Sequence, residues 1–390
     1  MRTIAVVTVG RADYGVLLPV LRRIQAAPDL RLCLIAGGMH LAEDFGHTVT
    51  AIEADGFEIA DRVDMQLASD TPVGIATAIG SGTIGFARAY ARMKADLLVL
   101  MGDRFETLAA AAAALPFGIP LAHLHGGELS AGAFDEQIRH AITKMSHLHF
   151  VATPTSAERV IQMGEEPWRV TVSGAPSLDN LRALSLLSVP ELERELGIGL
   201  TPTPLLVTYH PETLAYQNTG RQVNELFAAL AELERPIIIT YPNADTSSRQ
   251  IIDALEAFAR EHDNVRVVKN LGTTIYFSVM SCSAAMVGNS SSGIIEAASV
   301  RLPVVNIGER QAGRERAANV IDVGASRSEI ARGIHRALDP DFRKTIRDLQ
   351  NPYGDGCAAE RIVRVLGDVP IDRRLRRKIF HSMASACTSA

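Results

Sequence analysis

The densest group of residues that could do chemistry lies between positions 123 and 140. It comprises His123-Leu124-His125-Gly126-Gly127-Glu128, Asp135-Glu136 and Arg139-His140. Alternation along a strand would put His123 and His125 on one face, near the carboxylates of Glu128 and Asp135. Imidazole and carboxylate groups together are typical of general acid–base catalysis. A metal site and purely structural hydrogen bonding are the alternatives, but catalytic zinc sites usually have tighter ligand spacing.

Two earlier segments place glycine beside charged side chains directly after an apolar run. They are Gly10-Arg11-Ala12-Asp13-Tyr14-Gly15 and Gly102-Asp103-Arg104. A carboxylate such as Asp103 at the end of a strand can serve acid–base chemistry, and Arg11 and Arg104 can bind a phosphate. For the first segment the alternative is an ordinary turn in which Asp13 serves as a helix cap. For the second it is a surface ion pair in which Asp103 caps a helix.

The second half of the chain carries groups suited to a diphosphate. They lie in His210-Pro211-Glu212, Pro242-Asn243-Ala244-Asp245, Gly288-Asn289-Ser290-Ser291-Ser292-Gly293, Glu296 and Gly308-Glu309-Arg310-Gln311. Small polar residues and free N–H groups at the start of a helix can bind a diphosphate, to which Arg310 adds a cation. The loop 288–293 lacks the Lys of a Walker A motif and does not match a G-x-S-x-G nucleophile elbow. ATP hydrolysis and a serine nucleophile are therefore disfavoured.

A G-x-G-x-x-G pattern occurs at residues 80–85, with Asp103 about 20 residues later, as a dinucleotide site would require. That fingerprint needs a strand directly before it. The preceding segment, Thr71–Ile79, is predicted as a loop that enters a helix. We therefore expect these glycines to serve helix packing and not to bind NAD.

Short apolar runs alternate with helical segments along the chain. The predicted strands are Ile4–Val9, Leu32–Ala36, Leu97–Met101, Leu121–Leu124, His149–Ala152, Leu205–Thr208, Ile237–Thr240, Val265–Val268, Ala284–Val287 and Val304–Ile307. The predicted helices include Val16–Gln25, Glu106–Leu115, Gln222–Leu233 and Ile251–Glu261. The alternation indicates βαβ units and parallel sheets covered on both faces. Ten strands suit two sheets of about five, and ligands bind outside the carboxyl ends of such strands, where the polar segments lie.

The stretch from Gly174 to Pro204, rich in Pro, Ser and Leu, is the predicted seam between two domains. We expect an N-terminal Rossmann-like domain with the acid–base residues (1–178) and a C-terminal Rossmann-like nucleotide-binding domain (179–370). A basic tail (371–390) is predicted as a solvated terminal helix or a disordered segment.

Composition and charge exclude several classes of protein. The chain has 390 residues, of which 47% are hydrophobic, and a net charge of −5. This charge argues against general nucleic-acid binding, which needs a basic surface. Four widely spaced cysteines disfavour a disulfide scaffold and indicate a reducing compartment. Because the apolar runs are too short for a signal peptide or a membrane helix, we expect a cytoplasmic protein that binds no membrane.

Seven motifs in one order resemble a known family. They are Gly10-Arg11-Ala12-Asp13-Tyr14, Gly102-Asp103-Arg104, His123-Leu124-His125-Gly126-Gly127-Glu128, Ile138-Arg139-His140, His210-Pro211-Glu212, Gly288-Asn289-Ser290-Ser291-Ser292-Gly293 and Gly308-Glu309-Arg310-Gln311. The chain resembles the hydrolysing UDP-N-acetylglucosamine 2-epimerases from Thr3 to about Leu366. The resemblance implies the glycosyltransferase-B architecture, in which two Rossmann-like domains face each other across a cleft and use no NAD.

The resemblance also implies a reaction and the residues that perform it. UDP is eliminated from the sugar nucleotide to give a 2-acetamidoglucal, and water then adds to give free N-acetylmannosamine, the first step towards sialic-type acids. Asp103 and Asp135 match the acid–base carboxylates of the family. The matched nucleotide contacts are Arg11, Arg104, His210, Asn243, Ser290, Ser291, Glu296 and Arg310, and the matched residues of the sugar pocket are His40, His123 and Arg139. We add Glu128 to the substrate-binding candidates, and we expect no metal, no cofactor and a homodimer or homotetramer.

One position departs from part of the family. Several members carry Glu where this chain has His125, and imidazole can donate or accept a proton near neutral pH. We predict that His125 joins in proton transfer, with Asp103 and Asp135 setting its orientation. A similar branch acts on UDP-2,4-diacetamido-2,4,6-trideoxyglucose or a GDP analogue on the way to legionaminic acid, which leaves the substrate open. A retaining glycosyltransferase of the same fold and a binding protein without turnover are two competing hypotheses.

Overall fold

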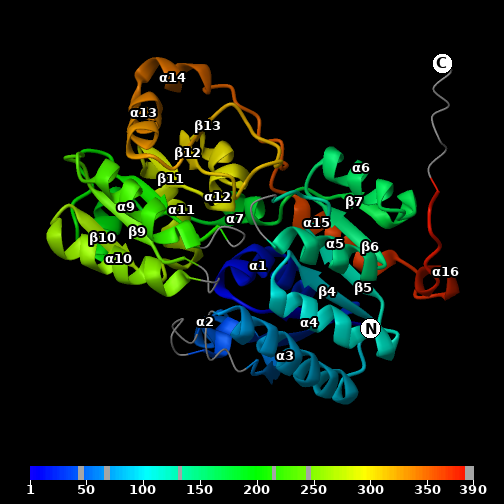
Figure 1. Cartoon of the computed structure of the whole chain (residues 1–390). Coiled ribbons are helices and arrows are strands. Elements are labelled where there is room, and N and C mark those ends of the chain that lie inside the picture. Colours follow the sequence, from blue (N-terminus) through cyan, green and yellow to red (C-terminus); the bar gives the residue numbers. More distant parts are fainter. Residues whose placement is uncertain (43–47, 66–70, 131–133, 213–216, 243–246, 383–390) are drawn as a thin grey trace, which may run out of the picture.

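The computed structural model describes residues 1–42, 48–65, 71–130, 134–212, 217–242 and 247–382. Within these ranges the chain folds around two parallel β-sheets, of seven and six strands, in two domains (Figure 1). The strand order is β3-β2-β1-β4-β5-β6-β7 in the first sheet and β10-β9-β8-β11-β12-β13 in the second. The predicted pair of Rossmann-like α/β domains is therefore confirmed.

The first sheet consists of β1 (Arg2–Thr8), β2 (Leu30–Gly37), β3 (Ile59–Val63), β4 (Leu97–Met101), β5 (Leu121–Leu124), β6 (Leu148–Val151) and β7 (Val170–Val172). Its α-helices are α1 (Arg11–Ala26), α2 (Val49–Ala54), α3 (Pro72–Arg92), α4 (Phe105–Ala114), α5 (Asp135–Met145), α6 (Pro154–Gln162) and α7 (Ser177–Ala183). Successive residues of β1 enter different cores: Ile4 and Val6 pack with α1, whereas Ala5 and Val7 pack with α3 and α4. Helices therefore cover both faces, which explains the uninterrupted apolar runs.

The second sheet consists of β8 (Leu205–Thr208), β9 (Ile237–Thr240), β10 (Val265–Val268), β11 (Ala285–Gly288), β12 (Val304–Ile307) and β13 (Val320–Val323). Its α-helices are α8 (Val189–Leu196), α9 (Thr219–Leu230), α10 (Ser248–Glu261), α11 (Gly272–Cys282), α12 (Ser291–Ile295), α13 (Arg327–Leu338) and α14 (Pro340–Thr345). Two hydrophobic clusters again occupy the two faces of the sheet, with Leu205 and Val207 in one and Leu206 in the other.

The last two helices return to the first domain (Figure 1). Helix α15 (Ala358–Asp368) packs on α1 and buries Ile362 and Leu366 in the core of the first sheet. Helix α16 (Arg373–Arg376) buries Leu375 in the same core. Helix α15 lies in the range predicted for the second domain but belongs to the first by its packing, whereas α16 shows local order within the predicted basic tail.

The ten predicted strands all form, and β4, β5, β8, β9, β10 and β12 have the predicted bounds. The expectation of about five strands in each sheet is wrong, because β3, β7 and β13 were not predicted. All three lie at the edges of the sheets and are short or mixed in polarity. An edge strand buries less of its surface, so its sequence needs no continuous apolar run.

The G-x-G-x-x-G pattern lies inside α3, and two of its glycines serve packing as predicted. A Cβ atom at Gly82 would lie 2.4 Å from Met65 Cε, and one at Gly85 would lie 2.6 Å from Val63 Cγ1. Glycine therefore lets α3 approach β3 and the residues that follow it. The spacing that resembles a dinucleotide fingerprint reflects this helix packing.

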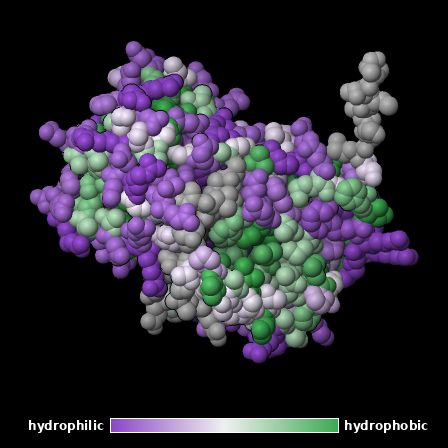
Figure 2. All heavy atoms as spheres, in the orientation of Figure 1, coloured by the Kyte–Doolittle hydropathy of each residue, from purple (hydrophilic) through white to green (hydrophobic). Residues whose placement is uncertain are grey.

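One face of the first domain is strongly apolar (Figure 2). On α3 the side chains of Val73 and Ile84 are 76% and 57% exposed, and Leu115 and Phe117 beyond α4 are also exposed. Among the described residues, no helix combines the length and the apolar character that crossing a membrane requires.

Candidate active site

Two connected cavities lie between the domains, beyond the carboxyl ends of both sheets. The larger has a volume of about 470 Å³ and is lined by residues of both domains, among them Arg11, His40, Tyr14, His210, Tyr276, Ser290, Ser291, Glu296 and Arg310. The smaller, of about 130 Å³, is lined by Asp103, Arg104, His125, Glu128, Asp135, Arg139, Ser291, Glu296, Arg310 and Arg314, among others. Ser291, Glu296 and Arg310 line both cavities, so the two form one continuous site.

His125 occupies a strained position at the end of β5. Its N–H still donates to Phe150 O at 3.0 Å, but its φ is +62°, in the left-handed region. Such a conformation costs a non-glycine residue on the order of 1–3 kcal/mol and is common at functional sites. Strand alternation ends at Leu124, so it does not place His125 on the face of His123 as predicted.

The His125 ring is held by Glu128 and not by the aspartates predicted to orient it. Nδ1 lies 2.6 Å from Glu128 Oε1, whereas Nε2 is buried and makes no hydrogen bond with the described residues. Glu128 Oε2 lies 3.2 Å from Arg314 Nη1, which comes from the second domain. Burial alone would raise the pKa of Glu128, but Arg314 and His125 outweigh it and lower the pKa to about 2. Glu128 is therefore an anion near neutral pH.

Asp103 is fixed by a buried arginine. Its carboxylate accepts a short hydrogen bond from Arg139, whose side chain is 1% exposed and also donates to Ser130 Oγ and to Glu128 O. Burial would raise the pKa of Asp103, but the guanidinium groups of Arg139 and Arg314 outweigh it and lower the pKa. Asp103 is thus an ionised carboxylate that is bound by Arg139 and lines the smaller cavity.

Asp135 is the third predicted acid–base residue on this side of the cleft. It is the first residue of α5 and lines the smaller cavity with Asp103 and His125. The structure therefore brings the three predicted catalytic residues together, although 32 positions separate the first from the last in the chain. They meet because β4 and β5 are neighbours in the sheet and α5 follows β5.

Most of the predicted nucleotide contacts line the larger cavity. Ser290 caps α12 and accepts from Ser292 N at 3.3 Å, and Arg310 Nη1 donates to Asn289 O at 3.3 Å. Glu296 accepts a short hydrogen bond from Ser177, and burial raises its pKa. Burial and the nearby arginines hold the pKa of His210 well below its usual value, so this imidazole is neutral.

Arginines of the first domain extend the positive charge of the site. Arg104 donates to Glu106 at 2.9 and 3.1 Å and lines the smaller cavity. Arg11 lines the larger cavity and donates a short hydrogen bond to Lys269 O in the second domain. His40 lines the same cavity, but its ring nitrogens lie 2.9 Å from Thr8 Oγ1 and 2.8 Å from Thr48 Oγ1.

Two predicted contacts differ or are not described. His123 is completely buried, and its ring nitrogens lie 3.1 Å from Thr143 Oγ1 and 2.7 Å from Gly102 O. It lines neither cavity of the cleft, so it supports the Gly102 turn and is not placed as the resemblance implied. Burial lowers the pKa of His123 to about 3. Asn243 lies outside the described residues.

Sequence reasoning missed several residues of the cleft, of which Arg314 is the most important. It lies four positions after Arg310 in an irregular segment, where neither periodicity nor strand ends indicate which arginine faces the cleft. Ser177, Tyr14 and Tyr276 also line the larger cavity. Ser177 lies within the predicted seam between the domains, and this position was its only signal in the sequence.

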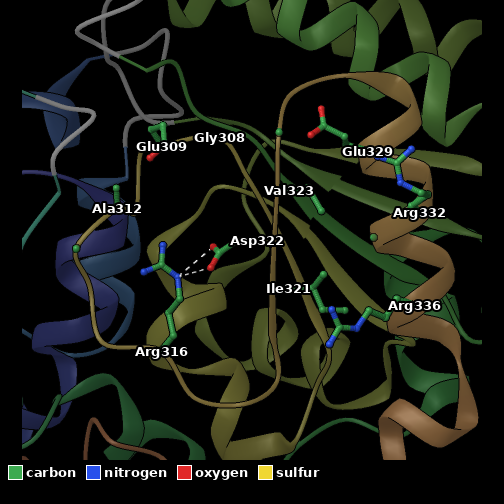
Figure 3. Close-up of a pocket in the computed structure, with 13 residues that line it drawn as sticks. Gly308, Glu309, Ala312, Arg316, Ile321, Asp322, Val323, Glu329, Arg332 and Arg336 are labelled. Carbon is green, nitrogen blue, oxygen red and sulfur yellow. Dashed lines mark hydrogen bonds and ion pairs between the residues drawn. The ribbon is translucent and has the colours of Figure 1, made fainter.

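A separate cavity of about 670 Å³ lies within the second domain, between the segment after β12 and helix α13 (Figure 3). Its side chains carry both charges, and Arg316 pairs with Asp322 at 3.0 Å. None of the predicted site residues lines it. In the part of the chain that the structure describes, no group of three or more His, Cys, Asp or Glu side chains has a geometry suited to a metal ion.

Comparison with known proteins identifies the family. The protein-family model described as UDP-N-acetylglucosamine 2-epimerase matches residues 22–367 of this chain. A UDP-N,N'-diacetylbacillosamine 2-epimerase (hydrolyzing) of Legionella pneumophila is 38% identical over 97% of this chain and 99% of its own length. The polysialic acid biosynthesis protein P7 of Escherichia coli is 34% identical over the full length of both chains.

Solved structures agree with the observed fold. The UDP-GlcNAc 2-epimerase of Neisseria meningitidis, solved with bound UDP-GlcNAc, aligns with a TM-score of 0.78 at 20% identity, over 94% of this chain and 99% of the other. This similarity supports the glycosyltransferase-B arrangement of the two domains. With the family match over most of the chain, it leads to one conclusion: the chain belongs to the UDP-N-acetylglucosamine 2-epimerase family.

Proposed function

We propose that this protein is a hydrolysing 2-epimerase of a UDP-linked 2-acetamido sugar, with UDP-N-acetylglucosamine as the first candidate substrate. The observation that carries the proposal is the continuous cleft in which Asp103, His125 and Asp135 of the first domain face Arg310 of the second. Acid–base groups at one end and a diphosphate-binding end next to it are what an elimination of UDP requires.

The nucleotide occupies the larger cavity in this proposal. Ser290, Ser291 and Arg310 bind the diphosphate, because hydroxyl groups and a guanidinium favour phosphate oxygens. Glu296 accepts from the ribose hydroxyls, and Arg11 and Arg104 add positive charge from the first domain. His210 is neutral at physiological pH, so it contributes hydrogen bonds and not charge.

The smaller cavity holds the sugar in this proposal, and the reaction has two stages. A base removes the proton from C2 while the bond between C1 and the diphosphate oxygen breaks, which releases UDP and forms the 2-acetamidoglucal. Water then adds its hydroxyl to C1, and an acid returns a proton to the opposite face of C2. Asp103, Asp135 and His125 share these transfers, and the ionised state of Asp103 suits a proton acceptor.

The test is a product assay with UDP-N-acetylglucosamine and no acceptor sugar. NMR should detect free N-acetylmannosamine and UDP in equal amounts. A retaining glycosyltransferase of this fold would release no 2-epimerised sugar, and a binding protein would leave the substrate intact. The absence of a free 2-epimerised sugar would exclude UDP-N-acetylglucosamine as the substrate, and the same result with the second UDP sugar considered below would contradict the proposal.

A second substrate, UDP-N,N'-diacetylbacillosamine, is favoured by a specific observation. Besides the Legionella relative, a GDP/UDP-N,N'-diacetylbacillosamine 2-epimerase (hydrolyzing) of Campylobacter jejuni is 35% identical over 97% of this chain. By comparison, a UDP-N-acetylglucosamine 2-epimerase of Neisseria meningitidis is 31% identical over 86% of this chain. Parallel assays with both UDP sugars and the GDP form, compared by kcat/KM, decide between them.

Self-association as a homodimer or homotetramer is part of the same proposal. The exposed apolar side chains of Val73 and Ile84 on α3 support it, because contiguous apolar surface often marks an interface (Figure 2). An Ile84→Asp variant should be smaller than the wild type by light scattering. A monomeric wild type would contradict this part of the proposal alone.

A further inference from the structure

We propose that Glu128 and Arg314 are positioning residues that hold the His125 ring with Nε2 facing the reaction cavity, in a chain of charges that joins the two domains. The role of His125 in proton transfer rests on the proposed function. The placement of the ring rests on geometry alone. Glu128, which the sequence suggests as a substrate contact, acts in this inference through His125.

The contact with Glu128 fixes which ring nitrogen is available. A carboxylate can only accept hydrogen bonds, so Nδ1 of His125 is the donor across the 2.6 Å contact with Oε1. In a neutral ring the single proton is then on Nδ1, and Nε2 carries the lone pair. Nε2 has no hydrogen-bond partner among the described residues, although the side chain is only 10% exposed. A buried nitrogen without a partner, in a ring that lines a cavity with Asp103 and Asp135, is placed to exchange a proton with a bound molecule.

Arg314 connects this pair to the second domain. Its Nη1 lies 3.2 Å from Glu128 Oε2, and its Nε donates to Leu129 O at 3.2 Å. The adjoining Gly313 has a φ of +84°, and a Cβ atom there would lie 2.9 Å from Leu129 Cβ. The two segments are therefore in direct contact, and the ion pair depends on the approach of the two domains.

Glu128 and Arg314 have opposite effects on a proton at His125. The carboxylate stabilises the imidazolium, whereas the guanidinium neutralises the carboxylate and so weakens that stabilisation. Other charged groups line the same cavity as the ring: Asp13, Asp103, Arg104, Asp135 and Arg139 from the first domain, and Glu296 and Arg310 from the second. Substitution of Glu128 or Arg314 leaves these groups in place. The difference between the variants therefore reports on the contacts that link His125, Glu128 and Arg314.

The protein contains a matched control, the buried pair of His149 and Glu165. His149 Nε2 lies 3.1 Å from Glu165 Oε2, and Lys144 and Lys378 donate to the same carboxylate. Neither member of this pair lines the cavities of the cleft. Glu165→Gln therefore removes a carboxylate from a histidine without touching the site.

The experiment compares Glu128→Gln, Arg314→Gln and Glu165→Gln in the full chain. The His125 ring is followed by ¹⁵N and ¹³C NMR across a pH titration, with its signals assigned by their loss in His125→Asn. Glu128→Gln should move the titration of His125 to lower pH, and Arg314→Gln should move it to higher pH. Glu165→Gln should leave it unchanged. Shifts in the same direction in both cleft variants, or no shift in either, would overturn the proposal.

Steady-state kinetics give the second readout. In Glu128→Gln we expect kcat to fall by roughly 10²-fold with KM little changed, because the loss affects proton transfer. Glu128→Gln should also shift one limb of the pH profile of kcat, and Arg314→Gln should shift the same limb in the opposite direction. If Glu128→Gln does not fold, Glu128→Asp keeps the charge but withdraws it from Nδ1. It should lower kcat with a smaller shift of the titration, and an unchanged kcat would overturn the proposal.

The two proposals fail in distinguishable ways, because the NMR titration needs no turnover. A wild-type protein that releases no free sugar from either UDP substrate would contradict the proposed function. Opposite shifts of the His125 signals in the same protein would still establish the positioning chain. Normal turnover with titrations that do not respond to the two substitutions would overturn the positioning chain only.

Discussion

The first domain contains two buried histidine–glutamate pairs with different surroundings, and their histidines lie directly after β5 and within the neighbouring strand β6. His125 and Glu128 line the cleft, and their cation, Arg314, comes from the other domain. His149 and Glu165 are 0% and 1% exposed and are held by Lys144 of the same domain and Lys378 of the C-terminal segment. In both pairs neighbouring cations and the histidine outweigh burial and lower the pKa of the carboxylate to about 2.

The comparison teaches that pairing and the pKa of the carboxylate do not distinguish the pair that lines the cleft from the pair that lies outside it. Each histidine also has one ring nitrogen without a hydrogen bond among the described residues, Nε2 in His125 and Nδ1 in His149. The difference is that the free nitrogen of His125 belongs to a ring that lines a cavity with two other acid–base groups. Position at the cleft, and not the shared chemistry, sets the two pairs apart.

The largest expected effect comes from substituting the two histidines. His125→Asn keeps a similar shape but cannot titrate, so we expect turnover to fall by about 10²–10⁴-fold while the melting temperature changes little. His149→Asn should lower the melting temperature and leave turnover within about threefold, because it disturbs packing and not the cleft. Single-turnover rates and thermal melts of both variants measure the contrast. A His125→Asn protein that is stable and turns over normally would remove His125 from the catalytic group.

This contrast also shows how far the sequence predicts the molecule. Apolar runs such as Leu97–Met101 predicted the buried strands, since a central parallel strand needs apolar residues on both faces. The polar residues after those strands predicted the position of the cleft, because parallel strands end at one edge of a sheet. The edge strand β13 and the return of α15 to the first domain were not predicted, because each depends on contacts between distant segments.

Individual roles in the site were harder to predict than its position. The spacing in the sequence does not distinguish His123 from His125. The positive φ of His125 turns this residue towards the cleft, whereas His123 is completely buried. Glu128 was expected to contact substrate, and the aspartates were expected to orient His125. The partner of a side chain depends on the path of the turn at residues 125–128, which residue types alone do not specify. Arg314 pairs across the domains, and no local pattern can reveal such a contact.

The second prediction compares an arginine of the cleft with a buried arginine beneath the C-terminal segment. Arg310→Ala should weaken UDP binding at least about tenfold by calorimetry, since a charge-assisted hydrogen bond contributes about 1.5–3 kcal/mol. Arg169 donates to three main-chain carbonyls of the C-terminal segment, at 2.8 to 3.1 Å. Arg169→Ala should therefore lower the melting temperature and leave UDP affinity unchanged. Unchanged UDP affinity in a folded Arg310→Ala protein would rule out Arg310 as a diphosphate contact.

The third prediction concerns how the contribution of Glu165 to the free energy of unfolding depends on pH. The pKa of Glu165 falls from 4.5 to about 2 on folding, so the unfolded chain binds this proton more readily than the folded one. The stabilisation is therefore complete above pH 4.5 and is lost as the pH falls towards 2. Glu165→Gln should lower the free energy of unfolding by about 1–2 kcal/mol at pH 7, and the difference should shrink below pH 4.5. Denaturant melts at several pH values measure it, and a difference that does not depend on pH would show that Glu165 stabilises through packing alone.

The smallest expected effect is that of metal removal, and it tests whether the cleft pair acts through protons or through a metal ion. A metal at His125 would have to use Nε2, because Nδ1 is committed to Glu128 at 2.6 Å. Glu128 in turn lies 3.2 Å from Arg314, a cation that opposes the approach of another positive ion. Dialysis against EDTA should therefore leave kcat within about twofold of the untreated enzyme. The control is addition of zinc to the dialysed sample, which should not raise the rate. Activity that disappears on dialysis and returns with zinc would make His125 a metal ligand, and the difference between the two histidine–glutamate pairs would then be one of coordination and not of proton transfer.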